Sequence, residues 1–229
     1  RGYDIGKIDY TIREISCKGC GNFCDVQEFN VEGEKSYWGD KCSERFRKRA
    51  KTNITPVIPD LLKLRKEFLL EEFEKYQPIA SAGPVIGIPR AMYFYEKFPF
   101  WNRYFTELGL RVEISDETNK EISHDGIDLC IAEPCYPIQV AHGHVKNVLA
   151  KGIDYLFLPN VLNSENEDVR PKSHLCPWGQ TLCFVIRQVP SFEGSRDRIL
   201  YPLIHFDMGP EFVKKELHAE PFRIGNSIF

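Results

Sequence analysis

The sequence predicts an α/β fold, a Rossmann-like three-layer parallel sheet preceded by a small N-terminal Cys-rich metal-binding hairpin. Two observations predict it. From residue 85 onward, short and continuously apolar runs alternate with longer stretches of helical period, which is typical of a parallel sheet covered by helices on both faces. Before residue 50, four cysteines lie in a polar, glycine-containing stretch, and their spacing is typical of metal coordination.

The expected strands are the apolar runs that stop at a proline or a turn residue, and the expected helices lie between them. We expect strands at residues 85–88, 111–115, 129–132, 155–158 and 199–204. We expect helices at residues 91–108, 117–124, 138–149, 179–188 and 210–218.

The domain organisation follows from the same pattern. Residues 1–50 form the Cys-rich metal-binding segment, residues 51–84 a helical linker, and residues 85–229 the Rossmann-like α/β domain. The linker combines leucines and phenylalanines at helical spacing with a closing stretch of prolines and small residues.

Composition excludes several classes of protein. Of the 229 residues, 42% are hydrophobic, which is enough for a real core and too many for a disordered chain. A formal net charge of −3 lacks the electrostatic signature of a general nucleic-acid binder. No apolar run approaches the roughly 20 residues of a membrane span, and the N-terminus does not have the pattern of a signal peptide. We therefore expect a soluble, cytoplasmic segment of a longer polypeptide, without nucleic-acid or membrane partners.

The first predicted metal site is formed by four cysteines near the N-terminus: Cys17, Cys20, Cys24 and Cys42. Thiolates two or three residues apart on a glycine-bearing turn can converge on one ion, and a fourth thiolate after the next hairpin can complete a tetrahedron. Residues 26–31 and 35–38 are the expected strands of that hairpin. The spacing fits structural zinc or an iron–sulfur cluster, because thiolates bind both. The alternative is four unligated thiols in an extended arm.

A second site is expected at the carboxyl edge of the sheet, where open α/β sheets bind their ligands. Cys135 follows the expected strand at 129–132, and Cys176 lies in the loop after the next expected strand. Prolines beside both cysteines make the loops rigid and limit water, which favours a buried iron–sulfur cluster over an exposed reactive thiol. A position in the core and a disulfide between the two cysteines are the alternatives.

Two thiolates do not complete such a cluster. The candidates for the missing ligands are bound substrate, residues outside this chain, Cys183, His174, His142 and His144. Cys130 and Cys183 lie in apolar runs and are otherwise expected as small buried hydrophobic residues. His142 and His144 are two residues apart, so on a helix they point about 200° from each other and cannot both bind one ion.

Four motifs stand out together: Ile86-Gly87-Ile88-Pro89-Arg90, Glu133-Pro134-Cys135-Tyr136-Pro137, Val140-Ala141-His142-Gly143-His144 and Lys151-Gly152-Ile153-Asp154-Tyr155. Combined, they resemble the activase-related domain of the 2-hydroxyacyl-CoA dehydratase and CoA-substrate-specific enzyme activase superfamily, which includes double-cubane-cluster reductases. The resemblance extends over roughly residues 10 to 190, and the motifs are specific only in combination.

The resemblance implies an iron–sulfur electron-transfer or reductase domain. Proteins of this type bind a [4Fe–4S]-type cluster with loop cysteines, and Cys135 and Cys176 match the first two in order and approximate spacing. A further ligand would come from a following Rossmann-like domain. An ATP-dependent activase would supply low-potential electrons for an acyl-CoA-type substrate. Glu133, His142 and His144 are the candidates for a catalytic or tuning role.

The chain departs from an activating ATPase in one respect. It contains no glycine-rich phosphate loop of the P-loop type, so we do not expect ATP hydrolysis in this segment. Two other functions stay open: a non-catalytic, zinc-stabilised scaffold of an activase–reductase assembly, and a thiol oxidoreductase that uses Cys135 and Cys176. A homodimer is compatible with each of them.

Overall fold

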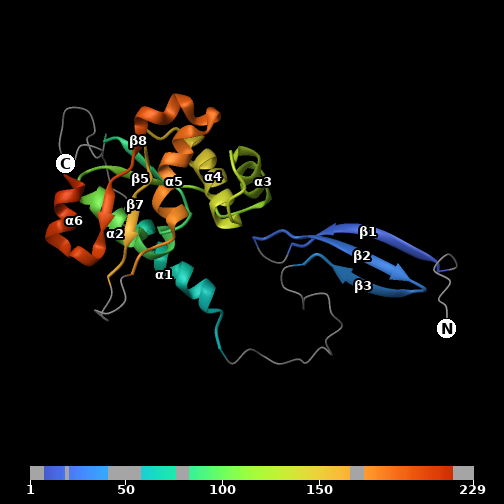
Figure 1. The fold of residues 1–229 in the computed structure, drawn as a ribbon. Helices are drawn as coiled ribbons and strands as arrows, with labels where there is room; N and C mark the ends of the chain where they lie inside the picture. Colours follow the sequence, from blue (N-terminus) through green and yellow to red (C-terminus); the bar gives the residue numbers. More distant parts are fainter. Residues whose placement is uncertain (1–7, 19–20, 41–57, 76–82, 166–172, 219–229) are drawn as a thin grey trace. The chain divides into compact units, whose positions relative to one another are not determined.

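The chain forms two compact units, residues 1–59 and residues 60–229 (Figure 1). A computed structural model describes residues 8–18, 21–40, 58–75, 83–165 and 173–218. The helix α1 (Leu61–Lys75) comes directly after this division and belongs to the second unit.

The first unit contains an antiparallel sheet in the order β1-β2-β3. Its strands are β1 (Tyr10–Ser16), β2 (Asp25–Val31) and β3 (Glu34–Trp38). The β2–β3 hairpin closes through Glu32 and Gly33, which both have positive φ, as the favoured two-residue hairpin turn requires. The sequence predicted the hairpin but not β1. Six of the seven β1 residues are exposed, so β1 has no one-sided apolar pattern by which it could be identified.

The second unit is built on a parallel sheet in the order β5-β4-β6-β8. Its strands are β4 (Val85–Ile88), β5 (Arg111–Ile114), β6 (Tyr155–Phe157) and β8 (Ile199–Leu200). A parallel pair, β7 (Asn160–Asn163) and β9 (Leu203–His205), follows β6 and β8 along the chain.

Prolines separate these strand segments without ending the pairing. Pro159 lies between β6 and β7, and Pro202 lies between β8 and β9. Each proline interrupts the strand because it has no N–H for the ladder. The Leu158 N–H donates to the Leu200 carbonyl at 2.8 Å, and the Asn160 N–H donates to the Pro202 carbonyl at 2.8 Å. The expected strand at 199–204 is therefore divided into β8 and β9, whereas β7 lies outside the expected strand at 155–158 and was not predicted.

Helices cover both faces of the parallel sheet. They are α1, α2 (Phe94–Glu107) and α6 (Pro210–Leu217) on one face, and α4 (Tyr136–Leu149) and α5 (Pro177–Gln188) on the other. Helix α3 (Lys120–Leu129) packs on α4, and η2 (Pro190–Arg198) and η3 (Phe206–Met208) are 3-10 helices. On β6, Phe157 packs into a hydrophobic cluster with α1, α2 and α6, whereas Leu156 packs into another with α4 and α5. This alternation confirms the expected α/β class with a parallel sheet. None of the described helices is long and apolar enough to cross a membrane.

The expected strand at residues 129–132 is wrong. Helix α3 runs to Leu129, and a short irregular segment then leads directly into α4. A brief apolar run at the end of an amphipathic helix has the same sequence pattern as a short buried strand. Cys135 therefore lies in a helix–helix connection and does not follow a strand.

Two glycines bring α3 and α4 close together. A Cβ at Gly126 would overlap the backbone carbonyl of Gln139, and a Cβ at Gly143 would overlap that of Ile122. The backbones can approach this closely only because neither position has a side chain.

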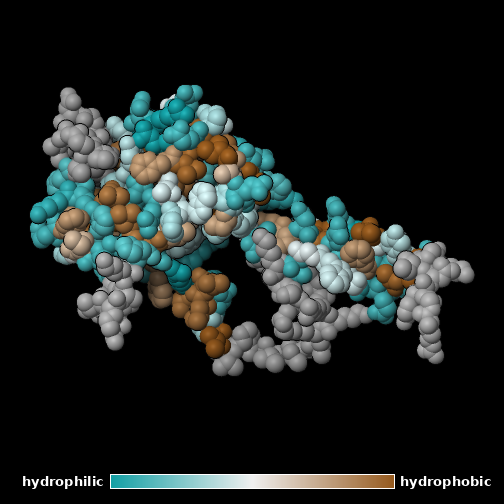
Figure 2. All heavy atoms as spheres, in the orientation of Figure 1, coloured by the Kyte–Doolittle hydropathy of each residue, from teal (hydrophilic) through white to brown (hydrophobic). Residues whose placement is uncertain are grey.

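Helix α1 has apolar side chains on its outer face (Figure 2). Leu69 is buried in the cluster with α2, whereas Leu62 and Phe68 are 79% and 64% exposed. Within the part of the chain that the structure describes, nothing covers these two side chains.

Candidate functional site at the carboxyl edge of the parallel sheet

Cys135 and Cys176 occupy equivalent positions, because each is the residue that directly precedes a helix, α4 and α5 respectively. Both helices return the chain toward the amino ends of parallel strands, β6 and β8. Their N-termini therefore lie at the carboxyl edge of the sheet. The two helices also pack into one hydrophobic cluster, through residues such as Ile138 and Leu182. The structure thus places both thiols at the starts of neighbouring helices on one edge.

Both thiols are free and exposed. Pro137 and Pro177 stand in the first turns of α4 and α5, where the fixed φ of proline favours the start of a helix. A position in the core, one of the alternatives, is therefore wrong for both cysteines, whereas the buried cluster stays a prediction. The prolines make the connections rigid, but connections between elements run over the surface, where their polar backbone groups meet water.

Other expected ligands lie near these cysteines in sequence. Glu133 and His174 each precede a cysteine by two residues, and both side chains are exposed. Cys183 is buried on α5, and its thiol donates to Asn160 Oδ1 at 2.7 Å. Burial raises the pKa of this thiol to about 11. The expectation that Cys183 fills the core is confirmed, whereas Cys130 is only half-buried.

Within the described ranges, no three side chains of His, Cys, Asp or Glu are grouped closely enough to bind a metal ion. The predicted four-cysteine site lies only partly within these ranges, because Cys20 and Cys42 are outside the described residues. Its other two members, Cys17 and Cys24, are both buried and pack with Val26. The Cys17 N–H donates to the Cys24 carbonyl at 2.8 Å, so these two cysteines face each other where β1 and β2 meet.

His142 and His144 lie on α4, are fully buried, and have different partners. His142 Nδ1 donates to the Ile138 carbonyl at 2.8 Å, whereas His142 Nε2 has no partner in the described residues. Burial lowers the pKa of His142. His144 lies between two hydroxyls, with Nδ1 2.8 Å from Ser115 Oγ and Nε2 2.9 Å from Thr118 Oγ1. Burial, with a smaller effect of the nearby Arg90, lowers its pKa to about 4, so His144 is neutral at pH 7.

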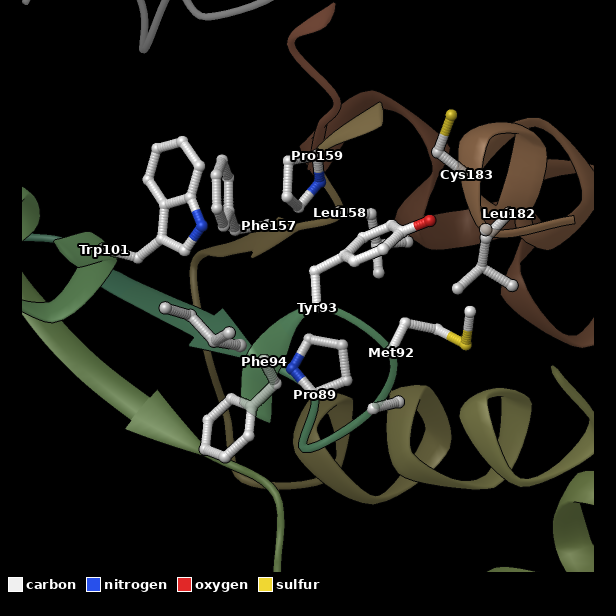
Figure 3. A pocket seen from close by; sticks show the side chains of 13 residues that line it. Pro89, Met92, Tyr93, Phe94, Trp101, Phe157, Leu158, Pro159, Leu182 and Cys183 are labelled. Atoms are coloured by element: carbon white, nitrogen blue, oxygen red, sulfur yellow. The ribbon is translucent and has the colours of Figure 1, made fainter. Parts of the chain in front are cut away.

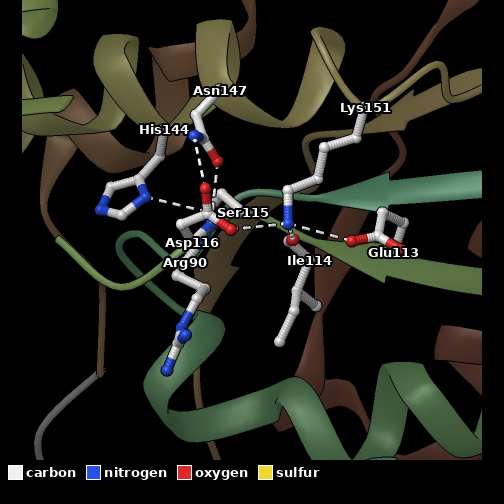
Figure 4. A network of polar contacts seen from close by, with 8 residues as sticks. All are labelled: Arg90, Glu113, Ile114, Ser115, Asp116, His144, Asn147 and Lys151. Atoms are coloured by element: carbon white, nitrogen blue, oxygen red, sulfur yellow. Dashed lines mark hydrogen bonds and ion pairs between the residues drawn. The ribbon is translucent and has the colours of Figure 1, made fainter. Parts of the chain in front are cut away.

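Neighbouring bonds favour one tautomer of His144. The backbone N–H of Arg90 donates to Ser115 Oγ at 2.8 Å, so the Ser115 hydroxyl proton is available for His144 Nδ1. His144 then carries its own proton on Nε2 and donates it to Thr118. This chain of bonds joins the loop after β4 to the loop after β5 and to α4 (Figure 4).

A second network lies beside it. Lys151 contacts Asp116 at 2.8 Å, Glu113 at 3.1 Å and the Ile114 carbonyl at 2.8 Å. Asn147 on α4 donates to Asp116 at 3.0 Å. Hydrogen bonds from Lys151 and Asn147 hold the pKa of Asp116 below its usual range. Of these residues, the sequence singled out only Lys151, as part of a motif, although polar side chains directly after a strand were the available signal for Asp116.

A pocket lies at the ends of β4 and β6 (Figure 3). Its lining comes from the β4 end, from the β6 end, from α2 and from α5: Ile88, Pro89, Ala91, Met92, Tyr93, Phe94, Trp101, Phe157, Leu158, Pro159, Gly179, Leu182 and Cys183. The sequence did not indicate this pocket, because most of its residues resemble ordinary core.

Comparison with known proteins identifies a family for this unit. No curated protein and no solved structure matches the chain. A family model described as the CoA enzyme activase uncharacterised domain (DUF2229) matches residues 85–227. The match begins with β4 and includes the parallel sheet, α2 to α6, both cysteines at the carboxyl edge and the pocket. The chain therefore belongs to the CoA enzyme activase uncharacterised domain family.

Proposed function

We propose that this chain is an electron-transfer domain that holds a [4Fe–4S]-type iron–sulfur cluster with Cys135 and Cys176. In this role it takes low-potential electrons from an ATP-dependent activase and delivers them to an acyl-CoA-type substrate. The cluster supplies one-electron transfer at low potential. Membership of the activase-related family supports the kind of assembly, and the two thiols support the kind of cofactor.

The observation that carries the proposal is the matched position of the two exposed thiols at the starts of α4 and α5. Helix N-termini stabilise anionic groups, and thiolate-ligated clusters are anionic. Two donors leave coordination positions for groups beyond the described residues, which fits a following Rossmann-like domain of a longer chain. The described cysteines are all free thiols, which supports the reducing cytoplasm as the compartment.

The other candidate residues have supporting roles in this proposal. Glu133 is exposed two residues before Cys135, and its negative charge near the cluster would favour a low potential. His142 and His144 are buried, so they act as positioning residues that hold α4 and, with it, Cys135.

Anaerobic reconstitution of the full chain with iron and sulfide tests the proposal. We expect a brown protein with a charge-transfer absorption band and a paramagnetic reduced state. Cys135→Ser and Cys176→Ser should each lose the corresponding iron, whereas Cys130→Ser should retain it, because Cys130 lies at the end of α3. An iron-free, colourless wild-type chain after anaerobic reconstitution would contradict the electron-transfer role.

We propose separately that Cys17, Cys20, Cys24 and Cys42 bind zinc or a second iron–sulfur cluster. Cys17 and Cys24 support this site, because both are buried and one backbone hydrogen bond joins them. Metal binding to a unit this small contributes about 10 kcal/mol or more to folding. Metal analysis of the double variant Cys17→Ser, Cys24→Ser should show loss of one site, and chelation should unfold the first unit.

A second candidate function is a non-catalytic, zinc-stabilised scaffold of such an assembly. It is favoured by the lack of any three-donor group among the described residues. It predicts zinc at the N-terminal site, no redox-active iron, and unchanged binding to the activase after Cys135→Ala. Sedimentation of the same samples measures whether the chain forms a homodimer.

A further inference from the structure

The pocket lies where the strand order of the parallel sheet reverses. From β4, the chain continues to β5 on one side, and β6 pairs with β4 on the other. Open α/β sheets bind ligands in the crevice at such a point, beyond the carboxyl ends of the strands. The inner volume of the pocket is about 40 Å³, against about 10–15 Å³ for one water molecule. The pocket is therefore large enough for a fragment of a few non-hydrogen atoms.

The walls of the pocket are apolar and uncharged. Trp101 and Phe157 form one side, and Leu182 of α5 forms another (Figure 3). None of the lining residues carries a charge, and the Cys183 thiol is already bonded to Asn160. Burying a charged group without a partner is strongly unfavourable, so a phosphate or a carboxylate does not suit this site.

Tyr93 supplies a hydroxyl to the pocket, whose lining also includes the indole of Trp101. The Tyr93 hydroxyl is buried and has no hydrogen-bond partner in the described residues, and it is directed toward α5 (Figure 3). Burial, followed by the effects of Cys176 and Glu96, raises the pKa of Tyr93 to about 12, so the phenol keeps its proton. The nearby Cys176 N–H is itself a donor and cannot accept that proton. A buried, unpaired donor in a native structure calls for an explanation.

Local backbone features keep the space beside this hydroxyl open. A Cβ at Gly179 would lie 2.6 Å from the Tyr93 hydroxyl oxygen and 3.0 Å from the Met92 methyl carbon. The absence of a side chain on the first turn of α5 therefore makes room for both groups. Met92 has φ +52°, a strained conformation for a residue that is not glycine.

We infer that this pocket binds a small uncharged ligand that has an apolar body and one hydrogen-bond acceptor, such as a carbonyl oxygen. The apolar walls hold the body, and the Tyr93 hydroxyl donates to the acceptor. The site is formed by this chain alone, so the inference does not rest on the cluster proposed above.

The chain's two methionines make the test direct, because Met92 lines the pocket and Met208 lies 58% exposed in η3, outside it. The full chain, treated with chelator to remove metal, is labelled with ¹³C at the methionine methyls. It is titrated with butan-2-one and with 2-methylbut-1-ene, in which a methylene group replaces the carbonyl oxygen. We expect both probes to shift the Met92 signal in a saturable way and to leave the Met208 signal in place.

Two variants identify the contacts. In Tyr93→Phe, the affinity for butan-2-one relative to that for the alkene should fall about threefold to tenfold, the effect of losing one hydrogen bond. Gly179→Ala should abolish the response to both probes, whereas Gly194→Ala, which has open space around it, should retain it. The Met208 signal and the amide spectrum report whether each variant is folded.

Two results would overturn the inference. One is a Met92 signal in the wild-type chain that neither probe moves, which would mean that the pocket holds water only. The other is an unchanged ketone-to-alkene affinity ratio in folded Tyr93→Phe, which would mean that the hydroxyl binds no acceptor. Because the titrations use metal-free protein, neither result depends on whether Cys135 and Cys176 bind iron.

Discussion

Protonation of His144 should destabilise the second unit as the pH falls. The imidazole is fully buried between Ser115 and Thr118, and its pKa is lowered to about 4, against about 6.5 for an unperturbed histidine. Because the pKa in the folded state lies below the unfolded value, the stabilisation is complete well above pH 6.5 and is lost as the pH falls toward 4. Between about pH 7.5 and pH 5 the linkage relation gives a loss of about 2 kcal/mol.

Urea unfolding at these two pH values, followed by the helical circular-dichroism signal, measures the effect. Within the described residues, the helices belong to the second unit. His144→Gln should be less stable than the wild type at pH 7.5, and its loss of stability on acidification should be about 2 kcal/mol smaller. His124→Gln, at an exposed position of α3, is the control for removing a surface imidazole.

His142 contributes in the same direction, because burial lowers its pKa as well. The test therefore compares the loss of unfolding free energy between the two pH values in His144→Gln with that in the wild type. The loss in the wild type alone would not separate His144 from His142. Carboxylates with lowered pKa values, such as Asp116 and Glu117, change protonation mainly below this pH range. If the wild type and His144→Gln lost the same stability between pH 7.5 and pH 5, His144 would not be a buried neutral imidazole.

Other substitutions test the packing and the polar network. Gly143→Ala should lower the free energy of unfolding by about 1 to 3 kcal/mol, because the added methyl overlaps the backbone of α3; Gly194→Ala, with nothing near its Cβ position, should be close to neutral by the same urea measurement. Trp101→Ala should lower it by about 3 to 5 kcal/mol, because this side chain is 2% exposed within an aromatic cluster. In Lys151→Met the pKa of Asp116 should rise toward its ordinary value, because its strongest partner is lost; a carboxyl-carbon NMR titration measures this shift.

Strand positions were predictable where one continuous apolar run ended at a turn. Strands β4 and β5 lie within one residue of the expected ranges 85–88 and 111–115. The range 129–132 failed because periodicity cannot separate four apolar residues at a helix end from a short strand. The segments after Pro159 and Pro202 resume as strands because these two segments, β7 and β9, pair with each other. That information is tertiary and has no local sequence signal.

The edge position of the cysteines was predicted from a partly wrong premise. Cys176 comes after strand β7, which was not expected, and Cys135 follows a helix. Cys135 reaches the same edge because α4 returns the chain to β6 and must begin at the carboxyl side. The direction of a helix between two parallel strands can thus be predicted more reliably than the type of element that precedes the helix. The resemblance of motifs within residues 85–227 to activase-related proteins agrees with the family match at the level of the family.

Tyr93 was not predictable as a binding residue, because its neighbours in sequence are aromatic and fill the core. What distinguishes it is a hydroxyl without a partner, and this depends on α5 approaching from the other end of the domain. The first turn of α5 links that pocket to the proposed cluster site, since Cys176 precedes the helix and Gly179 lies within its first turn. The Cys176 N–H also lies near the Tyr93 oxygen. A substitution at Gly179 would therefore move Cys176 as well as close the pocket, and for this reason the pocket is best titrated in metal-free protein.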